Sequence, residues 1–192
     1  MWDLIAMQRA VCIPRGGSAI AGPTPLALLP GSFNPLHRGH TELASIAAVR
    51  LGLPVHFELS IANADKPELP REEVERRITQ FTNIADVWIT RAPTFEAKAD
   101  LFPGAAFVLG WDTAVRVIDP KYYGGEVGRD AAMRKLMERG CRFVVGGRVD
   151  RDRRFRVWEG CDLPEEFARL FVALTETDFR ADVSSTQLRS SE

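Results

Sequence analysis

From Leu26 onward the chain alternates short apolar segments with amphipathic stretches, and this alternation limits its fold more than any other feature. Strand candidates are the apolar segments 26–29, 55–61, 87–90, 105–109, 143–145 and 170–174. Helical spacing of apolar residues is found at 38–51, 71–81, 94–101, 113–118 and 129–139. Strands that alternate with helices usually pair in parallel, because each helix carries the chain back along the sheet. The pattern predicts a doubly wound, Rossmann-like α/β fold with a mainly parallel sheet of five to six strands and helices on both faces.

The first 25 residues differ from the rest, because closely spaced Gly and Pro residues interrupt them before any period is sustained. We expect residues 1–25 to form a leader or packing arm. Residues 26–192 are long enough for one domain with a single sizeable core and leave little room for a second.

Composition excludes several classes of protein. With 25 basic and 26 acidic residues the net charge is −1, so a nucleic-acid-binding surface is not expected. No apolar run reaches the roughly 18–20 residues of a membrane span, and the N-terminus lacks the basic region of a secretory signal. The odd, widely spaced Cys12, Cys141 and Cys161 fit neither a disulfide framework nor a C-x-x-C metal motif. We expect a reduced, cytoplasmic protein without a membrane or nucleic-acid partner and without protein-bound metal.

The strand candidate 55–61 has one polar face, formed by His56, Glu58 and Ser60. A parallel strand covered on both sides normally reads as apolar throughout. The pattern therefore predicts an edge position or a partner surface, and His56 is expected to be a hydrogen-bonded structural residue.

The segment from Pro30 to His40 links the first predicted strand of the domain to its first helix, where ligands of doubly wound folds often bind. Gly31 has no Cβ to keep a ligand from the backbone, and a helix that begins near Arg38 directs free N–H groups at an anion. His37 and His40 lie on one side of the helix start and can donate hydrogen bonds to phosphate as cations. Such a pair also occurs as surface residues or helix caps. The sequence contains neither a G-x-G-x-x-G nor a G-x-x-x-x-G-K-[ST] loop.

A second anion site is predicted near the C-terminus. Ser184 is a suitable N-cap, with Ser185 and Thr186 in the first helical turn and Arg189 about one turn later. Hydroxyls, free N–H groups and a guanidinium would then meet at one phosphate. The alternative is a capped terminal helix with an exposed arginine.

Other candidates follow strands in the middle of the chain. Lys66 could reach a phosphate and Asn63 a polar group, although both also suit a solvated loop. Trp111 and Asp112 follow the strand at 105–109, and Asp112 is also expected to be the N-cap of the helix at 113–118. Phe95 could stack on a substrate ring or belong to the core.

Two of these segments resemble a known superfamily. Gly31-Ser32-Phe33-Asn34-Pro35 followed by His37-x-Gly39-His40 resembles the signature of nucleotidyltransferases that include nicotinamide mononucleotide adenylyltransferases, phosphopantetheine adenylyltransferases and cytidylyltransferases. The run from Val183 to Arg189 resembles their Ile-Ser-Ser-Thr-x-Ile/Leu-Arg motif. The resemblance implies that His37, His40 and Arg189 are catalytic, and Lys66 joins them as a proposed phosphate donor from its place after a strand. It implies nucleotide binding by Gly31, Ser32, Phe33, Asn34, Gly39, Ser184, Ser185 and Thr186.

The acceptor side shows a weaker resemblance. Gly110-Trp111-Asp112 resembles the Gly-x-Asp motif that contacts ribose and substrate, and Thr94-Phe95-Glu96 resembles Thr-Trp-Glu, whose aromatic ring stacks on nicotinamide. Substrate-binding roles are thereby implied for Phe95, Trp111 and Asp112, and Asn63 is a further substrate-binding candidate from its place after the strand at 55–61. The tryptophan found beyond the Gly-x-Asp motif is absent, with Lys121-Tyr122-Tyr123 in its region.

The resemblance implies transfer of a nucleoside monophosphate from a nucleoside triphosphate, first of all ATP, to a phosphorylated small molecule such as nicotinamide mononucleotide. Pyrophosphate is released, and Mg²⁺ is carried by the triphosphate. Cytidylyl transfer to a sugar- or alcohol-phosphate and a non-catalytic nucleotide-binding module are the alternatives. A fragment of a class I aminoacyl-tRNA synthetase fits less well, because no Lys-Met-Ser-Lys-Ser-like loop is found. A homo-oligomer is left open.

Overall fold

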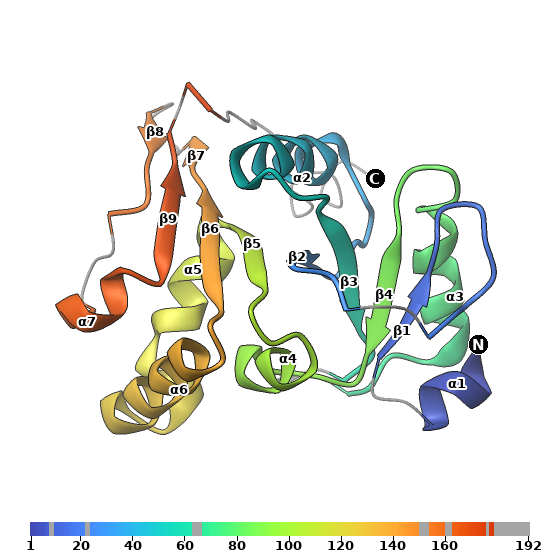
Figure 1. The fold of residues 1–192 in the computed structure, drawn as a ribbon, viewed down its shortest axis with the longest axis horizontal. Coiled ribbons are helices and arrows are strands. Elements are labelled where there is room, and N and C mark those ends of the chain that lie inside the picture. Colours follow the sequence, from blue (N-terminus) through green and yellow to red (C-terminus); the bar gives the residue numbers. More distant parts are fainter. Residues whose placement is uncertain are drawn as a thin grey trace.

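The computed structural model describes residues 1–7, 10–21, 24–62, 67–149, 154–159, 163–175 and 177–178. Its main sheet has seven strands in the order β1-β4-β3-β2-β5-β6-β9, all parallel except β1 (Figure 1). Their bounds are Ala10–Ile13 (β1), Ala27–Pro30 (β2), His56–Ser60 (β3), Val87–Thr90 (β4), Ala106–Gly110 (β5), Arg142–Gly146 (β6) and Phe171–Leu174 (β9). The predicted α/β class and all six predicted strands are confirmed.

The seventh strand, β1, comes from the segment expected to be a leader or packing arm. It pairs antiparallel with β4, with Ala10 opposite Thr90 and Ile13 opposite Val87. The periodicity missed it because four residues directly before Pro14 are too few to show an alternation. A short antiparallel strand therefore covers one edge of the sheet.

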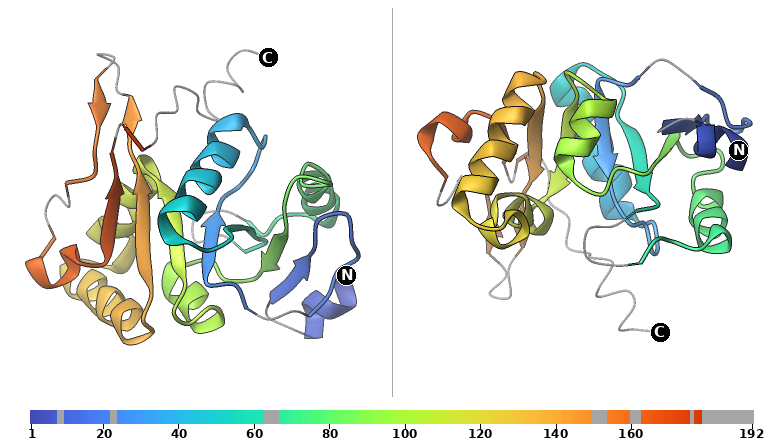
Figure 2. Two further views of the ribbon diagram at one scale, coloured as in Figure 1. Left: turned by 45° about the horizontal axis from the view of Figure 1, so that its top comes forward. Right: turned by 90° about the horizontal axis from the view of Figure 1, so that it is seen from below.

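Helices cover both faces of the sheet (Figure 2). They are α1 (Trp2–Met7), α2 (Arg38–Leu51), α3 (Arg71–Thr79), α4 (Phe95–Leu101), α5 (Trp111–Ile118), the 3₁₀ helix η1 (Pro120–Tyr123), α6 (Glu126–Glu138) and α7 (Glu165–Ala168). Side chains of α1, α2 and α3 pack into one apolar core, and those of α4, α5, α6 and α7 pack into a second core on the other face. Among the described residues, no helix combines the length and apolarity that a bilayer span requires.

The helix α2 shows how the pattern produces these layers. Its residues Leu43, Ala44 and Ala47 are buried on one side, and the helix stops at Gly52, which adopts a left-handed φ of 66°. A left-handed residue after the last turn ends a helix with little strain when it is glycine. The helix thus runs back along the sheet and delivers the chain to β3.

The order of strands reverses beside β2. From β2 the chain moves outward to β3 and β4, and it then returns to the other side of β2 to add β5, β6 and β9. The connections that leave β2 and β5 therefore diverge at the carboxyl ends of neighbouring strands. This is the place where doubly wound sheets generally bind ligands.

The polar face of β3 has a different origin from the one expected. The expectation of an edge or partner surface is wrong, because β3 lies between β4 and β2. Glu58 is 1% exposed, and its carboxylate accepts hydrogen bonds from Lys98 Nζ at 2.8 Å to each oxygen. Thr90 Oγ1 donates to the same carboxylate at 2.5 Å. The charge on the strand is thus matched inside the core by a lysine from α4.

The lysine also fixes the backbone beyond β4. Its Nζ donates to Ala92 O at 2.8 Å, and Ser60 Oγ donates to the same carbonyl at 2.9 Å. Each buried polar atom of the pair therefore has a partner, which is the condition under which buried charges are tolerated.

A second, two-stranded sheet follows β6. Strands β7 (Arg148–Val149) and β8 (Phe155–Arg156) pair antiparallel. Gly147 permits their approach, since a Cβ there would lie 2.4 Å from Phe155 Cζ. The arginine-rich run at 148–156 therefore includes both strands of a ribbon.

Removing one partner of the buried pair should destabilise the fold strongly. Lys98→Met leaves the Glu58 carboxylate buried without its cation, and we expect a loss of about 3–5 kcal/mol in the free energy of unfolding. The double variant Glu58→Leu/Lys98→Met should recover much of this loss. Urea unfolding measures both.

The matched control is Lys121→Met, because Lys121 pairs with Asp119 at 2.6 Å but is 65% exposed. An exposed pair of this kind contributes about 0–1 kcal/mol. A double variant no more stable than Lys98→Met, or equal effects at Lys98 and Lys121, would contradict the assignment.

Candidate nucleotide-binding site

The loop between β2 and α2 is anchored by Phe33. Its ring is fully buried and meets His40, Phe57 and Phe81 edge-on, at centroid distances of 5.2, 5.5 and 5.0 Å. Phe33 has a left-handed φ of 45°, and the Asn34–Pro35 peptide bond is cis. A predicted nucleotide-binding residue thus has its side chain in the core, which leaves its backbone for a ligand.

The absence of a side chain at Gly31 allows the Phe33 ring to pack in this way. The sequence suggested that its missing Cβ makes room for a ligand, but a Cβ at this position would lie 2.7 Å from the ring of Phe33. The glycine therefore allows the phenylalanine to fold back beneath the loop.

The helix α3 holds the loop from outside. Gln80, just after α3, donates through Nε2 to Phe33 O at 2.9 Å and accepts from Leu36 N at 2.8 Å. Arg77 Nη1 donates to Ser32 O at 2.9 Å. Loop carbonyl and amide groups that would otherwise need water are thereby fixed by side chains.

Arg76 and Glu73 complete the set of side chains, with Arg77 and Gln80, that holds the loop; we call this set the clamp. Arg76 Nη2 donates to Asn34 Oδ1 at 2.6 Å, and Glu73 accepts from Arg77 at 2.7 Å. Sequence reasoning missed Arg76, Arg77 and Gln80, because each is more than 40 positions from the loop residue that it contacts. The feature of the sequence that could have identified Arg77 and Gln80 is their position beside the apolar stripe of α3.

His37 and His40 meet at the start of α2. Their rings stack with centroids 3.8 Å apart, and His37 N donates to His40 Nδ1 at 3.3 Å. His37 is the N-cap of α2, and Gly39 is buried in the first turn. Because Nδ1 of His40 accepts a hydrogen bond, the proton of its neutral ring belongs on Nε2. A role of the two histidines in binding a ligand is therefore compatible with their place at the cap of α2.

Burial lowers the pKa of both histidines below 6.5. For His40 the pKa falls to about 4, with the charge of His37 as a second cause. The sequence suggested two cations, whereas the free protein holds neutral rings at pH 7. A neutral ring still donates one hydrogen bond, and a bound polyanion would raise both pKa values.

The carboxyl end of β5 forms the other side of the place, beside β2, where the order of strands reverses. The prediction that Asp112 caps a helix at 113–118 is wrong, because α5 begins at Trp111 with Gly110 as its N-cap. Asp112 lies in the first turn and is 73% exposed, and its carboxylate pairs with Arg148 of β7. Trp111 packs edge-on against Trp158 at 5.6 Å. The ribbon thus supplies Arg148 beside Asp112, a neighbour that the sequence did not indicate.

Phe95 is placed in the second core. Its ring meets Phe107 at 5.4 Å and Phe143 at 5.3 Å, both edge-on. The geometry favours the core interpretation of Phe95 over stacking on a substrate.

Six predicted site residues lie outside the described residues. They are Asn63, Lys66, Ser184, Ser185, Thr186 and Arg189.

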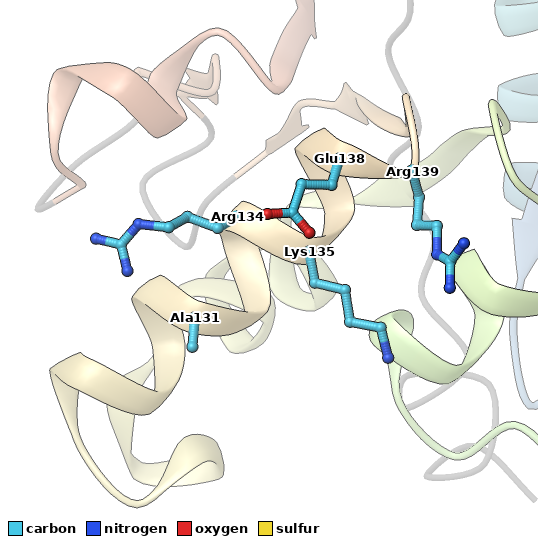
Figure 3. A pocket seen from close by; sticks show the side chains of 5 residues that line it. All are labelled: Ala131, Arg134, Lys135, Glu138 and Arg139. Carbon is cyan, nitrogen blue, oxygen red and sulfur yellow. The ribbon is translucent and has the colours of Figure 1, made fainter.

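A surface depression on α6 lies elsewhere (Figure 3). It is lined by Ala131, Arg134, Lys135, Glu138 and Arg139. The end of α6 leads directly into the amino end of β6, so the depression is at the opposite end of the sheet from the His37 loop. Lys135 and Arg139 each pair with Asp100 at 2.8 Å. The positive charges of Lys135 and Arg139 are already paired with a carboxylate of α4, and these residues do not belong to the candidate site.

Acid should weaken the fold through His40. The unfolded chain takes up a proton near pH 6.5, whereas folded His40 stays neutral down to about pH 4. The free energy of unfolding should therefore fall as pH drops through this window, by up to about 3 kcal/mol from this residue. Thermal unfolding of the wild type and of His40→Asn between pH 7 and 4 measures the difference. Asparagine can accept from His37 N but does not titrate, so equal losses in both proteins would refute the assignment.

Comparison with known proteins agrees with this geometry. Residues 28–191 match the cytidylyltransferase-like family, a range that contains the loop after β2, α2 and the carboxyl end of β5. No curated protein matches the chain. The match supports a nucleotidyltransferase kind of activity. With most of its length matched, and with a paired-histidine helix start at the switch point of a parallel sheet, the chain belongs to the cytidylyltransferase-like family.

Proposed function

We propose that the protein transfers a nucleoside monophosphate from a nucleoside triphosphate, with ATP as the first donor to test, to a phosphorylated small molecule. Nicotinamide mononucleotide is the first acceptor, and pyrophosphate is the second product. The observation that carries the proposal is the stacked His37–His40 pair at the start of α2, beside the point where the strand order reverses.

Donor binding follows from the helix and its loop. The 14-residue helix α2 directs free N–H groups and the positive end of its dipole toward the carboxyl end of β2. The Nε2–H group of His40 and a ring N–H of His37 add donors that suit phosphate oxygens. In the proposal, Lys66, Arg189 and the hydroxyls of Ser184, Ser185 and Thr186 bind the outer phosphates.

The chemistry needs no general base. A phosphate monoester is largely ionised near neutral pH. Its oxygen attacks the α-phosphorus as the bond to the bridging oxygen of the β-phosphate breaks, and that electron pair leaves with pyrophosphate. The histidines orient the triphosphate and stabilise the charge that develops on phosphoryl oxygens. Mg²⁺ enters as part of the nucleotide substrate and neutralises further charge.

The acceptor side rests on the carboxyl end of β5. Asp112 is proposed to contact ribose, and Trp111 the neighbouring substrate surface. Because Asp112 pairs with Arg148, an acceptor hydroxyl would have to share or replace that contact. Arg148 would then be free for the acceptor phosphate.

Two observations favour a second candidate, cytidylyl transfer to a sugar- or alcohol-phosphate. The ring of Phe95 packs in the core, and Lys121-Tyr122-Tyr123 stands where the adenylyltransferases have their acceptor tryptophan. Packing in the core withdraws the Phe95 ring from nicotinamide, and tyrosines stand in the region of the tryptophan. Neither difference affects the donor site.

A screen of pyrophosphate release tests the proposal. ATP and CTP are each combined with nicotinamide mononucleotide, sugar phosphates and alcohol phosphates. The active pair should lose about 10²–10³-fold in kcat/KM with His40→Ala, because one preorganised donor to the reacting phosphates is removed.

The control is Val49→Ala, since Val49 is 85% exposed near the far end of α2. Its turnover should match the wild type. Full activity of His40→Ala would remove this residue from the mechanism. Calorimetric binding of a nucleotide without pyrophosphate release from any acceptor would instead identify a non-catalytic module and overturn the proposal.

The clamp from α3 should matter for activity. Gln80→Leu removes the contacts to Phe33 O and Leu36 N, so the loop is held less firmly beside the phosphates. We expect about a tenfold or larger loss of kcat/KM with the fold retained. Thr79→Ala, which removes only an exposed bond to Arg76 O, is the neighbouring control. Equal kinetics in the two variants would show that the clamp does not position the nucleotide.

A further inference from the structure

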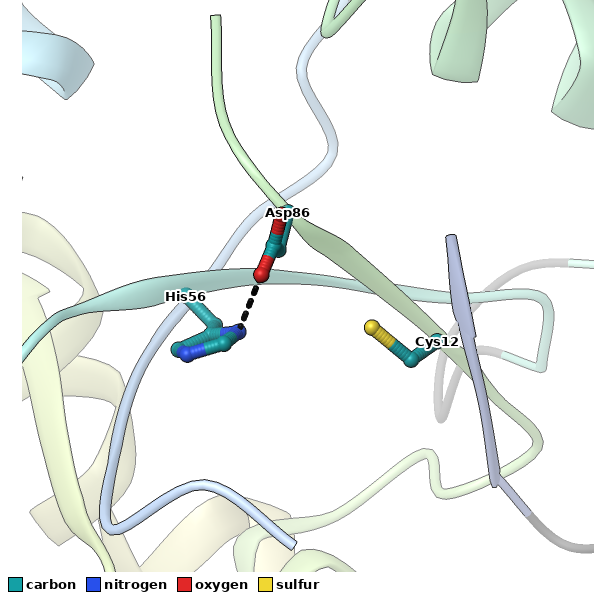
Figure 4. Close-up of side chains that lie close together, drawn as sticks. All are labelled: Cys12, His56 and Asp86. Carbon is teal, nitrogen blue, oxygen red and sulfur yellow. Dashed lines mark ion pairs between the residues drawn. The ribbon is translucent and has the colours of Figure 1, made fainter. Parts of the chain in front are cut away.

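Three side chains that are distant in sequence converge beside the edge strand (Figure 4). Cys12 is on β1, His56 begins β3, and Asp86 immediately precedes β4. One ligand atom from each, a thiol sulfur, an imidazole nitrogen and a carboxylate oxygen, lies within 4.8 Å of the others. The cluster is at the amino ends of β3 and β4, so it is separate from the candidate nucleotide site at the carboxyl ends.

We propose that Cys12, His56 and Asp86 bind a zinc ion that ties β1 to β3 and β4. Sulfur, imidazole nitrogen and carboxylate oxygen are the three donor types that Zn²⁺ takes from proteins. Mg²⁺ and Ca²⁺ prefer oxygen ligands alone, so this mixed set disfavours them. The proposal departs from the expectation drawn from cysteine spacing, which considered only ligands close together in sequence.

The imidazole is ready to bind a metal. His56 Nδ1 is buried and makes no hydrogen bond within the described part of the chain, contrary to the expectation of a hydrogen-bonded residue. Asp86 Oδ2 is its nearest ionic partner, at 3.5 Å. A buried polar atom without a hydrogen bond is rare in a folded protein and needs an explanation. A bound cation supplies one.

The other two ligands are held in place by the backbone around them. Asp86 Oδ1 accepts from Arg15 N at 2.7 Å, which orients the carboxylate and leaves Oδ2 toward His56. Cys12 exchanges backbone hydrogen bonds with Ile20 at 2.9 and 2.7 Å and is paired with Trp88 on its other side. Outer contacts of this kind orient metal ligands in known sites.

The charges of the cluster suit a divalent ion. A thiolate, a carboxylate and a neutral imidazole together balance Zn²⁺. Metal binding would release the thiol proton of Cys12, because the ligand is the thiolate. The side chains of His56 and Asp86 are 21% and 37% exposed, so water would be available to complete a set of four ligands.

Cobalt substitution in the full chain tests the site. Co²⁺ is added to metal-free protein, and the thiolate-to-metal charge-transfer band is recorded before and after Zn²⁺ is added. We expect one ion per chain, a band that Zn²⁺ abolishes, and loss of the band in Cys12→Ser. Cys141→Ser is the control, because Cys141 is equally buried but its sulfur lies by Phe102 O at 3.6 Å.

Asp86→Asn tests the site in case the cysteine variant fails to fold. It should keep the contact with Arg15 N and weaken Zn²⁺ binding at least tenfold, with the circular dichroism spectrum unchanged. Zn²⁺ should raise the Tm of the wild type and of Cys141→Ser but not of Asp86→Asn. A Co²⁺ complex without a thiolate band, or binding that survives both Cys12→Ser and Asp86→Asn, would overturn the proposal. A metal ion bound at His37 and His40 instead would still bind after both substitutions.

Discussion

Helices cover both faces of the parallel sheet, and this constraint governs where polar side chains can lie. A polar group on a central strand has to find its partner inside the protein. Glu58 does so with Lys98 and Thr90, at hydrogen-bond distances from 2.5 to 2.8 Å. Elsewhere the two cores are almost wholly apolar in the described residues. Reactive groups are therefore confined to the two ends of the strands, where the backbone meets solvent.

The two strand ends differ in character. At the carboxyl ends, a buried phenylalanine and side chains from α3 fix a loop that leads into the paired histidines of α2. Burial keeps these imidazoles neutral until an anion arrives, so the free site avoids placing two positive charges 3.8 Å apart. At the amino ends, Cys12, His56 and Asp86 face one another. The same sheet thus separates the proposed nucleotide chemistry from the proposed metal site.

Local patterns in the sequence predicted the larger features for definite reasons. The helix over 38–51 was predicted with its observed bounds, because apolar spacing and the Gly52 stop agree. The start of α5 was predicted two residues late, since Gly110 caps it without a side-chain hydrogen bond. The polar face of β3 was misjudged because its partner, Lys98, is 40 positions away on another element. Local rules describe periods and caps, and they do not identify long-range partners.

The sequence by itself determined the α/β class, the six parallel strands and the histidine-bearing start of α2. Each of these depends on patterns among residues that are close together in the sequence. Only the tertiary structure decided that Gly31 makes room for Phe33, that Gln80 and Arg77 hold the loop, and that β1 completes the sheet. It also brought Cys12 to His56 and Asp86. These arrangements depend on which strands become neighbours, and the packing of helices on both faces settles that choice.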